Sequence, residues 1–135
     1  MAQVETILAK GIKLEKLSYE IANWKRAQAQ NRMEQLIRQY GNTIELVLSN
    51  NDDMALGALD SYRIMGYTKD NMPMILGVDG MQEALEAVKD GRLAGTVYND
   101  KEGQAQVMAA IVFASVSGKG LDGINFENLT EVYLP

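Results

Sequence analysis

The sequence predicts an α/β domain built as three αβα layers around a mostly parallel sheet. Three observations lead to this prediction. Apolar residues recur with the spacing of a helix in some stretches and alternate like a strand in others, and the two kinds of stretch follow one another along the chain. A glycine follows most of the helical stretches. The 135 residues, 47% of them hydrophobic, are enough for one compact domain with a core.

The expected elements of the N-terminal third follow from these spacings. Residues 2–11 have the pattern of a short helix that ends at Gly11, and residues 14–22 alternate like a strand. A second helix follows, and Gly41 ends it. Its apolar face consists of Ala29, Met33, Leu36, Ile37 and Tyr40.

The rest of the chain continues the alternation. A short apolar strand at 44–49 leads into a helix for which residues 50–52 offer N-cap side chains and which Gly66 ends. The buried face of that helix is predicted to carry Ala55, Leu59, Tyr62 and Met65. The remaining expected elements are a strand at 74–78 after Pro73, a helix at 81–89 before Gly91, a strand at 93–98, a helix at 104–116 and a last strand at 131–134.

The composition excludes several classes of function. The chain has no cysteine and no histidine, which removes disulfides, thiolate nucleophiles, histidine-based triads and the common zinc sites. Its net charge of −5 argues against a nucleic-acid partner. No apolar run approaches the ~20 residues of a membrane-spanning helix, and the N-terminus lacks the features of a signal peptide. We therefore expect a protein that is not an enzyme and does not insert into a membrane.

Polar or aromatic residues directly follow four of the predicted strands. Ligands of parallel α/β sheets bind beyond the carboxyl ends of the strands. Asn51, Asp79 and Asn99 offer hydrogen-bonding side chains there, and Trp24 offers a flat apolar face. A pyranose has hydroxyl groups around its rim and C–H groups on its faces. The set of residues therefore predicts a monosaccharide site.

Each of these residues also has a structural interpretation. The pairs Asn51-Asp52 and Asn99-Asp100 precede helices and suit an N-cap, and Asp79 before Gly80 suits a turn. A lone tryptophan such as Trp24 is more often packed than exposed to a ligand. The functional interpretation depends on the coincidence that all four clusters fall on one edge of one predicted sheet.

Four segments of the sequence resemble the C-terminal lobe of the periplasmic sugar-binding proteins of ABC transport, in particular their galactose/glucose-binding branch. The resemblance runs from about residue 8 to the end of the chain, with the segments in the family's order. It implies a Rossmann-like lobe of a type I periplasmic binding protein. The segments are Asn23-Trp24-Lys-Arg-Ala-Gln, Asn51-Asp52-Asp-Met-Ala-Leu-Gly, Gly77-Val78-Asp79-Gly80 and Val97-Tyr98-Asn99-Asp100.

The resemblance implies roles for individual residues. Trp24 is expected to stack on one face of the sugar, and Asn51, Asp79 and Asn99 to bond its hydroxyl groups. An asparagine at the last of these positions favours the hexose branch over the ribose branch. Glu45 matches a glutamate of the family's calcium site, although by itself it would be interpreted as a surface residue. We expect calcium in a full-length parent and no cofactor in this chain.

The family has two lobes with the sugar between them, and residues 1–135 leave room for only one. We therefore expect a single, incomplete C-terminal lobe: a fragment of a solute-binding protein whose parent captures galactose or glucose for ABC transport and chemotaxis. Its partners would be the monosaccharide and a transporter permease, in the periplasm or, with or without a lipid anchor, outside the cell. A half-site should bind sugar weakly or not at all. An open sheet edge would favour a homo-oligomer.

A second class of function stays open at this point. The effector-binding domains of sugar-responsive transcription repressors share the expected fold and an Asn-Asp-x-Met-Ala-x-Gly motif. Repressors usually carry Gly-Phe-Asp where this chain has Gly77-Val78-Asp79, and they usually lack the Val-x-Asn-Asp segment. A helix-turn-helix upstream in the parent gene would favour the repressor, and a signal peptide would favour the transport protein.

Overall fold

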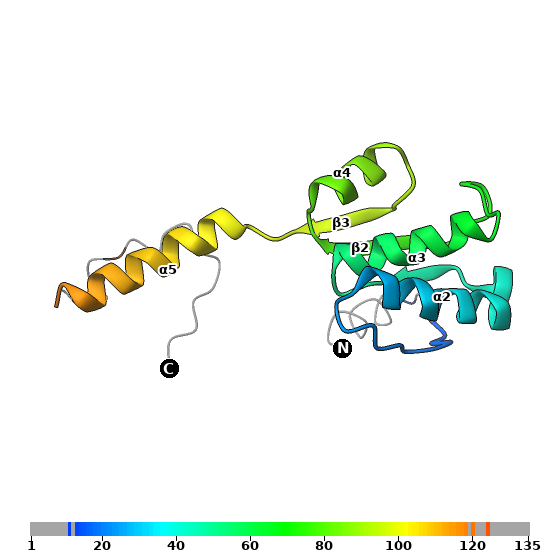
Figure 1. The fold of residues 1–135 in the computed structure, drawn as a ribbon, viewed down its shortest axis with the longest axis horizontal. Coiled ribbons are helices and arrows are strands. Elements are labelled where there is room, and N and C mark those ends of the chain that lie inside the picture. The colour runs from blue at the N-terminus through cyan, green and yellow to red at the C-terminus, as the bar shows by residue number, and fades with distance from the viewer. Residues whose placement is uncertain (1–10, 12, 119, 121–123, 125–135) are drawn as a thin grey trace. The chain divides into compact units, whose positions relative to one another are not determined.

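The computed structural model describes residues 11, 13–118, 120 and 124 (Figure 1). The chain divides into two compact units, and the division falls in the sequence between Tyr98 and Asn99. The second unit contains one described helix, α5 (Lys101–Val116). Apart from Gly11, the predicted helix at 2–11 lies outside the described residues, as does the predicted strand at 131–134. The first unit contains α2 (Arg26–Tyr40), the short helix η1 (Gly41–Thr43), β1 (Leu46–Leu48), α3 (Asp52–Ile64), β2 (Met74–Asp79), α4 (Gln82–Lys89) and β3 (Gly95–Tyr98).

The sheet of the first unit is parallel, with the strand order β1-β2-β3. Leu46 of β1 pairs with Met74 of β2, and Leu76 of β2 pairs with Gly95 of β3. Helix α3 connects the first two strands and α4 connects the second and third. The predicted α/β class with a parallel sheet is confirmed, and the carboxyl ends of all three strands lie on one edge.

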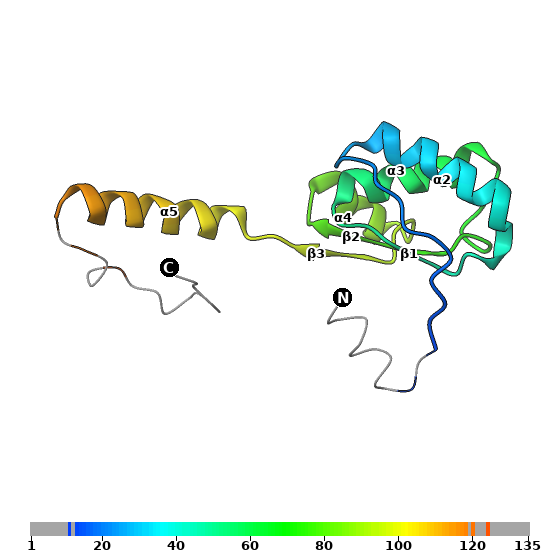
Figure 2. The same cartoon turned by 90° about the horizontal axis from the view of Figure 1, so that it is seen from below.

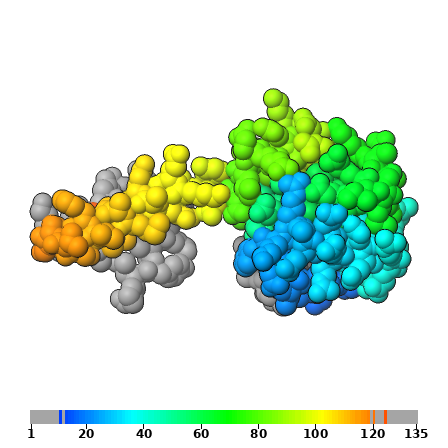
Figure 3. Space-filling model, viewed as in Figure 1, coloured from blue at the N-terminus to red at the C-terminus, as the bar shows by residue number. Residues whose placement is uncertain are grey.

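The hydrophobic core lies where α3 and α4 cover one face of the sheet and α2 packs against α3 (Figure 2). Ile75 of β2 is buried together with Leu56 and Leu59 of α3 and with Ala84 and Ala87 of α4. In the space-filling view, the blue to cyan atoms of α2 lie directly against the green atoms of residues that follow it in the sequence (Figure 3). Helix α3 is therefore buried on two sides, by the sheet and by α2.

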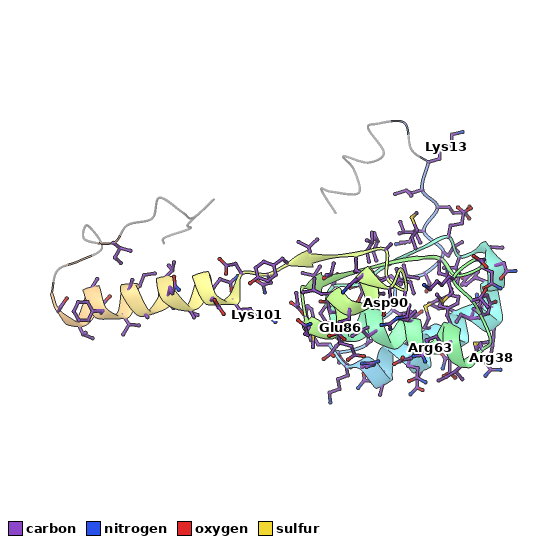
Figure 4. The ribbon with its side chains drawn as sticks, turned by 90° about the horizontal axis from the view of Figure 1, so that it is seen from above. Lys13, Arg38, Arg63, Glu86, Asp90 and Lys101 are labelled. Carbon is purple, nitrogen blue, oxygen red and sulfur yellow. The ribbon has the colours of Figure 1, made fainter. Side chains whose placement is uncertain are left out.

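The opposite face of the sheet carries apolar side chains that remain accessible. The register places Leu48, Met74 and Val97 on this face, and their exposed fractions are 56%, 60% and 66%. In the view with side chains, Arg63 of α3 and Glu86 of α4 lie on the helical side (Figure 4). The apolar character of the strands therefore extends to a surface that the described residues of the first unit leave accessible.

Helices α2 and α3 approach closely because Gly57 has no side chain. A Cβ atom at this position would collide with the backbone carbonyl oxygen of Arg26 and would lie 3.2 Å from the Cβ of Ala29. Close to this crossing, the Ser61 hydroxyl donates a hydrogen bond of 2.8 Å to the carbonyl of Gln30. The spacing of the two helices is thus set by backbone atoms.

Arg26 connects the three helices through its side chain. Its Nε donates to Asp60 of α3 at 2.7 Å, and its Nη1 donates to Glu83 of α4 at 2.8 Å. The hydrogen bond with Asp60, supported by the one with Glu83, raises the pKa of Arg26 above its ordinary value although partial burial acts in the opposite direction. The guanidinium therefore stays charged and holds the amino end of α2 against its neighbours.

Tyr62 of α3 is buried in the core as predicted, together with its polar hydroxyl group. Its ring packs edge-on against Tyr67, with 5.0 Å between the ring centroids. Its buried hydroxyl has no hydrogen-bond partner among the described residues. Burial, with a smaller contribution from Tyr67, raises the pKa of Tyr62 to about 12.

The predicted strand at 14–22 is wrong. These residues form an irregular segment without ladder pairing to another described strand. Tyr19 and Ile21 are exposed, whereas Ala22 is buried. The carbonyl of Leu17 accepts a hydrogen bond of 3.1 Å from the Tyr40 hydroxyl. Alternating apolar residues suit a strand, but a strand also needs a partner for its backbone groups.

The other predicted elements within the described residues are confirmed, with small differences at their ends. Gly41, Gly66 and Gly91 end helices with φ angles of 55°, 83° and 70°. Helix α5 begins at Lys101, earlier than predicted, because the Asp100 carboxylate caps it by accepting from the Gly103 amide at 2.9 Å. None of the described helices has both the length and the apolar composition needed to cross a bilayer.

Candidate functional site

The structure brings Asn51, Asp79 and Trp24 to the carboxyl edge of the sheet in the first unit. Asn51 follows β1 and opens α3, and Asp79 is the last residue of β2. Trp24 belongs to the turn before α2, and its backbone carbonyl accepts a hydrogen bond of 3.4 Å from Nδ2 of Asn51. Three of the four predicted sugar-binding residues therefore lie in one region.

Trp24 is exposed to solvent, so it is not a packing residue. Its exposed fraction is 64%. Its backbone has a φ angle of 61°, and the preceding residue, Asn23, has a φ angle of 49°. This left-handed conformation is rare for an aromatic residue and costs free energy, and such strain is typical of functional sites. The turn is held by a bond of 2.9 Å from the Lys25 amide to the Ala22 carbonyl.

Asn51 is the N-cap of α3, so the structural interpretation of this residue is correct. Its Oδ1 accepts a hydrogen bond of 2.9 Å from the Met54 amide. The cap leaves binding capacity on the side chain, because the amide oxygen has a second lone pair and Nδ2 has a second hydrogen besides the one that it donates to Trp24. The half-buried Asn51 side chain can therefore cap the helix and bind a hydroxyl group at the same time.

Asp79 ends β2 in a conformation that non-glycine residues rarely adopt. Its φ angle is 125°, and Gly80 follows with a φ angle of 68°. The side chain is half-buried. The turn interpretation of this pair is therefore correct, and the turn also places a carboxyl group at the carboxyl edge beside β3, where Asp79 pairs with Tyr98.

The residue that joins these strand ends is Asp52, which the sequence suggested only as a cap. Its side chain is completely buried. Its Oδ1 accepts a hydrogen bond of 2.6 Å from the Thr96 hydroxyl, and its Oδ2 accepts one of 2.8 Å from the Met81 amide. The sequence pair Asn51-Asp52 could have indicated a second role, because only one of two adjacent residues can be the N-cap and the other can bind elsewhere.

Asn99 belongs to the second unit and is described with it. Its Oδ1 accepts a hydrogen bond of 2.6 Å from Nε2 of Gln104, and the neighbouring Asp100, not Asn99, caps α5. The cap interpretation of the Asn99-Asp100 pair is therefore correct for Asp100. The sugar-binding role of Asn99 stays a prediction.

Glu45 lies exposed just before β1, where its backbone carbonyl accepts a hydrogen bond of 3.0 Å from the Met74 amide. Calcium binds six to eight oxygen ligands. Within the part of the chain that the structure describes, no three acidic side chains come together in a way that could hold a metal ion. The role of Glu45 in binding calcium, in a longer parent protein, stays a prediction.

Two hollows on the first unit lie away from the predicted site residues. One of about 360 Å³ is lined by Gln30, Asp60, Arg63 and Ile64 on α2 and α3. The other, of about 170 Å³, lies near the amino ends of β2 and β3, where Met74 and Ala94 are among its lining residues. Trp24, Asn51 and Asp79 are not among the lining residues of either hollow.

A parallel sheet with polar side chains and an exposed indole at its carboxyl edge defines an α/β ligand-binding lobe. Residues 1–120 match the family described as periplasmic binding protein domain. The chain belongs to this family.

Relatives of known identity cover nearly the whole chain. The chain is 37% identical over 119 residues to the xylitol-binding protein of Mycolicibacterium smegmatis. The matched region is 88% of the chain and 33% of that protein. The chain is also 38% identical over 117 residues to the D-galactose/methyl-galactoside binding periplasmic protein of Haemophilus influenzae. This matched region is 86% of the chain and 34% of that protein. The chain thus spans about a third of the length of these relatives.

Solved structures share the fold. The Caulobacter myo-inositol binding protein bound to myo-inositol matches with a TM-score of 0.80 and 25% identity, over 87% of this chain and 40% of that one. An ABC transporter solute binding protein from Bacillus halodurans with bound myo-inositol matches with a TM-score of 0.76 and 31% identity, over 84% of this chain and 39% of that one. The predicted fold class is that of these type I periplasmic binding proteins.

These comparisons confirm two predictions. The resemblance to periplasmic sugar-binding proteins is correct, and the relatives are substrate-binding proteins, not enzymes. The matched family is typically periplasmic, binds sugars and works with ABC transporter permeases. The match favours the transport class over the repressor class.

Proposed function

We propose that this chain is the C-terminal sugar-binding lobe of a solute-binding protein that captures a monosaccharide, galactose or glucose, for ABC transport. The observation that carries the proposal is the exposed Trp24, held in a left-handed turn and bonded through its carbonyl to Asn51 at the carboxyl edge of the sheet. The relative named for D-galactose and methyl-galactoside supports a hexose.

The chemistry of the three side chains suits one face and one edge of a pyranose. The indole of Trp24 offers an apolar surface to the C–H face of the ring. The Asn51 amide can donate to one hydroxyl group and accept from another, and the Asp79 carboxylate accepts hydrogen bonds from hydroxyl groups. Together these groups make one wall of a site. A single wall leaves the sugar in contact with water, so we expect weak binding.

Intrinsic fluorescence tests the proposal directly, because Trp24 is the only tryptophan in the chain. We expect galactose and glucose to change the Trp24 emission with a dissociation constant on the order of 10 mM, which corresponds to roughly 3 kcal/mol. Ribose is the control for specificity, and polyethylene glycol at matched viscosity is the control for viscosity. If neither hexose changes the emission or the amide resonances of Asn51 up to roughly 100 mM, the chain has no usable sugar site.

The family also supports proposals about the parent protein. A periplasmic location and a transporter permease as partner follow from the class of the relatives, with chemotaxis as a further role of a galactose or glucose receptor. A signal peptide in the parent gene would support the location, and a helix-turn-helix in the same gene would contradict it.

We further propose that two copies of this chain associate through the sheet. Among the described strands, β1 and β3 are the edges, and Leu48 and Val97 on these strands are exposed. An unpaired edge next to apolar side chains can pair with the same edge of a second copy. Size-exclusion chromatography with light scattering should give a dimer at about 100 μM, and Val97→Lys should shift it toward the monomer by placing a charge on the edge. A monomeric wild-type protein at that concentration would overturn the proposal.

A further inference from the structure

We propose that Asp52 is a positioning residue of the ligand site. Its buried carboxyl group fixes the turn at Asp79 and Gly80 against the start of α3, and thereby sets how the Asp79 carboxylate and the Asn51 amide are presented together. The inference deepens the proposed function and rests on it, because what Asp52 positions are the proposed sugar-binding groups.

Both oxygens of Asp52 act as hydrogen-bond acceptors. Oδ1 accepts from the Thr96 hydroxyl of β3 at 2.6 Å, and Oδ2 accepts from the amide of Met81 at 2.8 Å. Asp52 itself is the first residue of α3. One buried side chain thus joins α3, β3 and the turn between β2 and α4.

The turn needs such support because its backbone is strained. Asp79 has a φ angle of 125°, where a side chain is unfavourable. The next amide, of Gly80, donates to Oγ1 of Thr96 at 3.3 Å, while the Thr96 hydroxyl donates to Asp52. Asp52 therefore acts on Gly80 indirectly, through the Thr96 hydroxyl, and on the Met81 amide directly, through its own hydrogen bond.

The surroundings of Asp52 provide both the space and the favourable charge that a buried carboxyl group needs. The adjacent strand position is Gly77, where a Cβ atom would collide with Oδ1 of Asp52 and lie 3.2 Å from the Cβ of Ala55. The amino end of α3 carries a partial positive charge that favours a carboxylate in its first turn. Burial of this side chain is therefore compatible with a stable fold.

Asn51 is tied to the same arrangement through the backbone. It is the N-cap of α3 and directly precedes Asp52, so the position of the Asn51 amide follows the position of the first turn of α3. A change that releases Met81 and Thr96 from Asp52 frees the turn at Asp79 from the end of α3. The spacing between the two proposed sugar-binding groups would then vary.

The test uses Asp52→Asn and Thr96→Val, each with a matched control. Asp52→Asn keeps the shape but replaces one acceptor oxygen by a donor group, and Asp53→Asn makes the same change at the next residue, outside this network. Thr96→Val removes the hydroxyl, and Thr96→Ser keeps it.

The first measurement is amide hydrogen exchange by NMR without ligand. We expect Gly80 and Met81 to exchange at least about tenfold faster in Asp52→Asn, and Gly80 in Thr96→Val.

Two internal references separate this effect from general destabilisation. The amide of Leu85 within α4, which donates to the Met81 carbonyl at 2.9 Å, should keep its protection. The controls Asp53→Asn and Thr96→Ser should exchange like the wild type at Gly80 and Met81. Unchanged protection of these two amides in Asp52→Asn would overturn the inference.

The second measurement is galactose affinity by Trp24 fluorescence. We expect Asp52→Asn and Thr96→Val to weaken it about tenfold, and the controls to leave it unchanged. Wild-type affinity in Asp52→Asn would overturn the positioning role. If the wild type does not respond to galactose, the proposed function fails, and the exchange of Gly80 and Met81 alone decides whether Asp52 fixes the turn.

Discussion

Replacing Gly57 by alanine is expected to lower the free energy of unfolding by about 2–3 kcal/mol. A Cβ atom at this position collides with the backbone carbonyl oxygen of Arg26, and backbone atoms cannot rotate away as a flexible side chain can. Helices α2 and α3 would have to separate, which loosens the packing of Ala29 against α3. Urea unfolding monitored by circular dichroism measures the loss.

Gly66→Ala is the matched control for this change. Gly66 has a φ angle of 83°, and nothing lies within 4 Å of the position of its Cβ atom. Alanine there introduces backbone strain without a collision, so we expect a cost of about 1–2 kcal/mol. A cost for Gly57→Ala that does not exceed the cost for Gly66→Ala would show that the close approach of α2 to α3 does not limit stability.

Replacing Trp24 by alanine is expected to separate binding from stability. The ring is 64% exposed, so its loss should change the free energy of unfolding by less than about 0.5 kcal/mol. Affinity for galactose should fall by about 2 kcal/mol, or roughly 30-fold, because a tryptophan that contacts a ligand is typically a dominant contributor. Since the variant lacks the fluorophore, the side-chain amide resonances of Asn51 report the titration.

Tyr19→Ala is the matched control for Trp24→Ala. Tyr19 is an aromatic residue that is 74% exposed and lies in the irregular segment before Trp24. Its loss should leave both stability and galactose affinity unchanged. Equal effects of the two substitutions on affinity would mean that Trp24 is an ordinary surface residue.

The order of the elements could be predicted because each depends on short-range features. Helix α2 shows apolar residues at helical spacing, and a glycine with a left-handed backbone ends it at Gly41. The failure at residues 14–22 has a different origin. Alternation describes which side chains can face a core, but a ladder depends on whether another strand lies alongside, and that information is not contained in the segment itself.

The part of the candidate site that depends only on strand topology could be predicted from the sequence. The rule that parallel sheets bind ligands at their carboxyl ends was sufficient to select Asn51 and Asp79. It could not show that Trp24 is exposed, because an indole is apolar enough to be packed equally well. It also missed Asp52, because the role of that residue depends on Met81 and Thr96, which are distant in the sequence.

The left-handed backbone at Asn23, Trp24 and Asp79 has a consequence for how this protein responds to selection. Glycine adopts such angles without the cost that a side chain brings, roughly 1 kcal/mol at each position. A laboratory evolution experiment that rewards heat resistance alone would therefore favour glycine at these sites. The selected proteins would be more heat-resistant but would lack the indole and the carboxylate, so selection for stability would remove the side chains that we propose to bind the sugar.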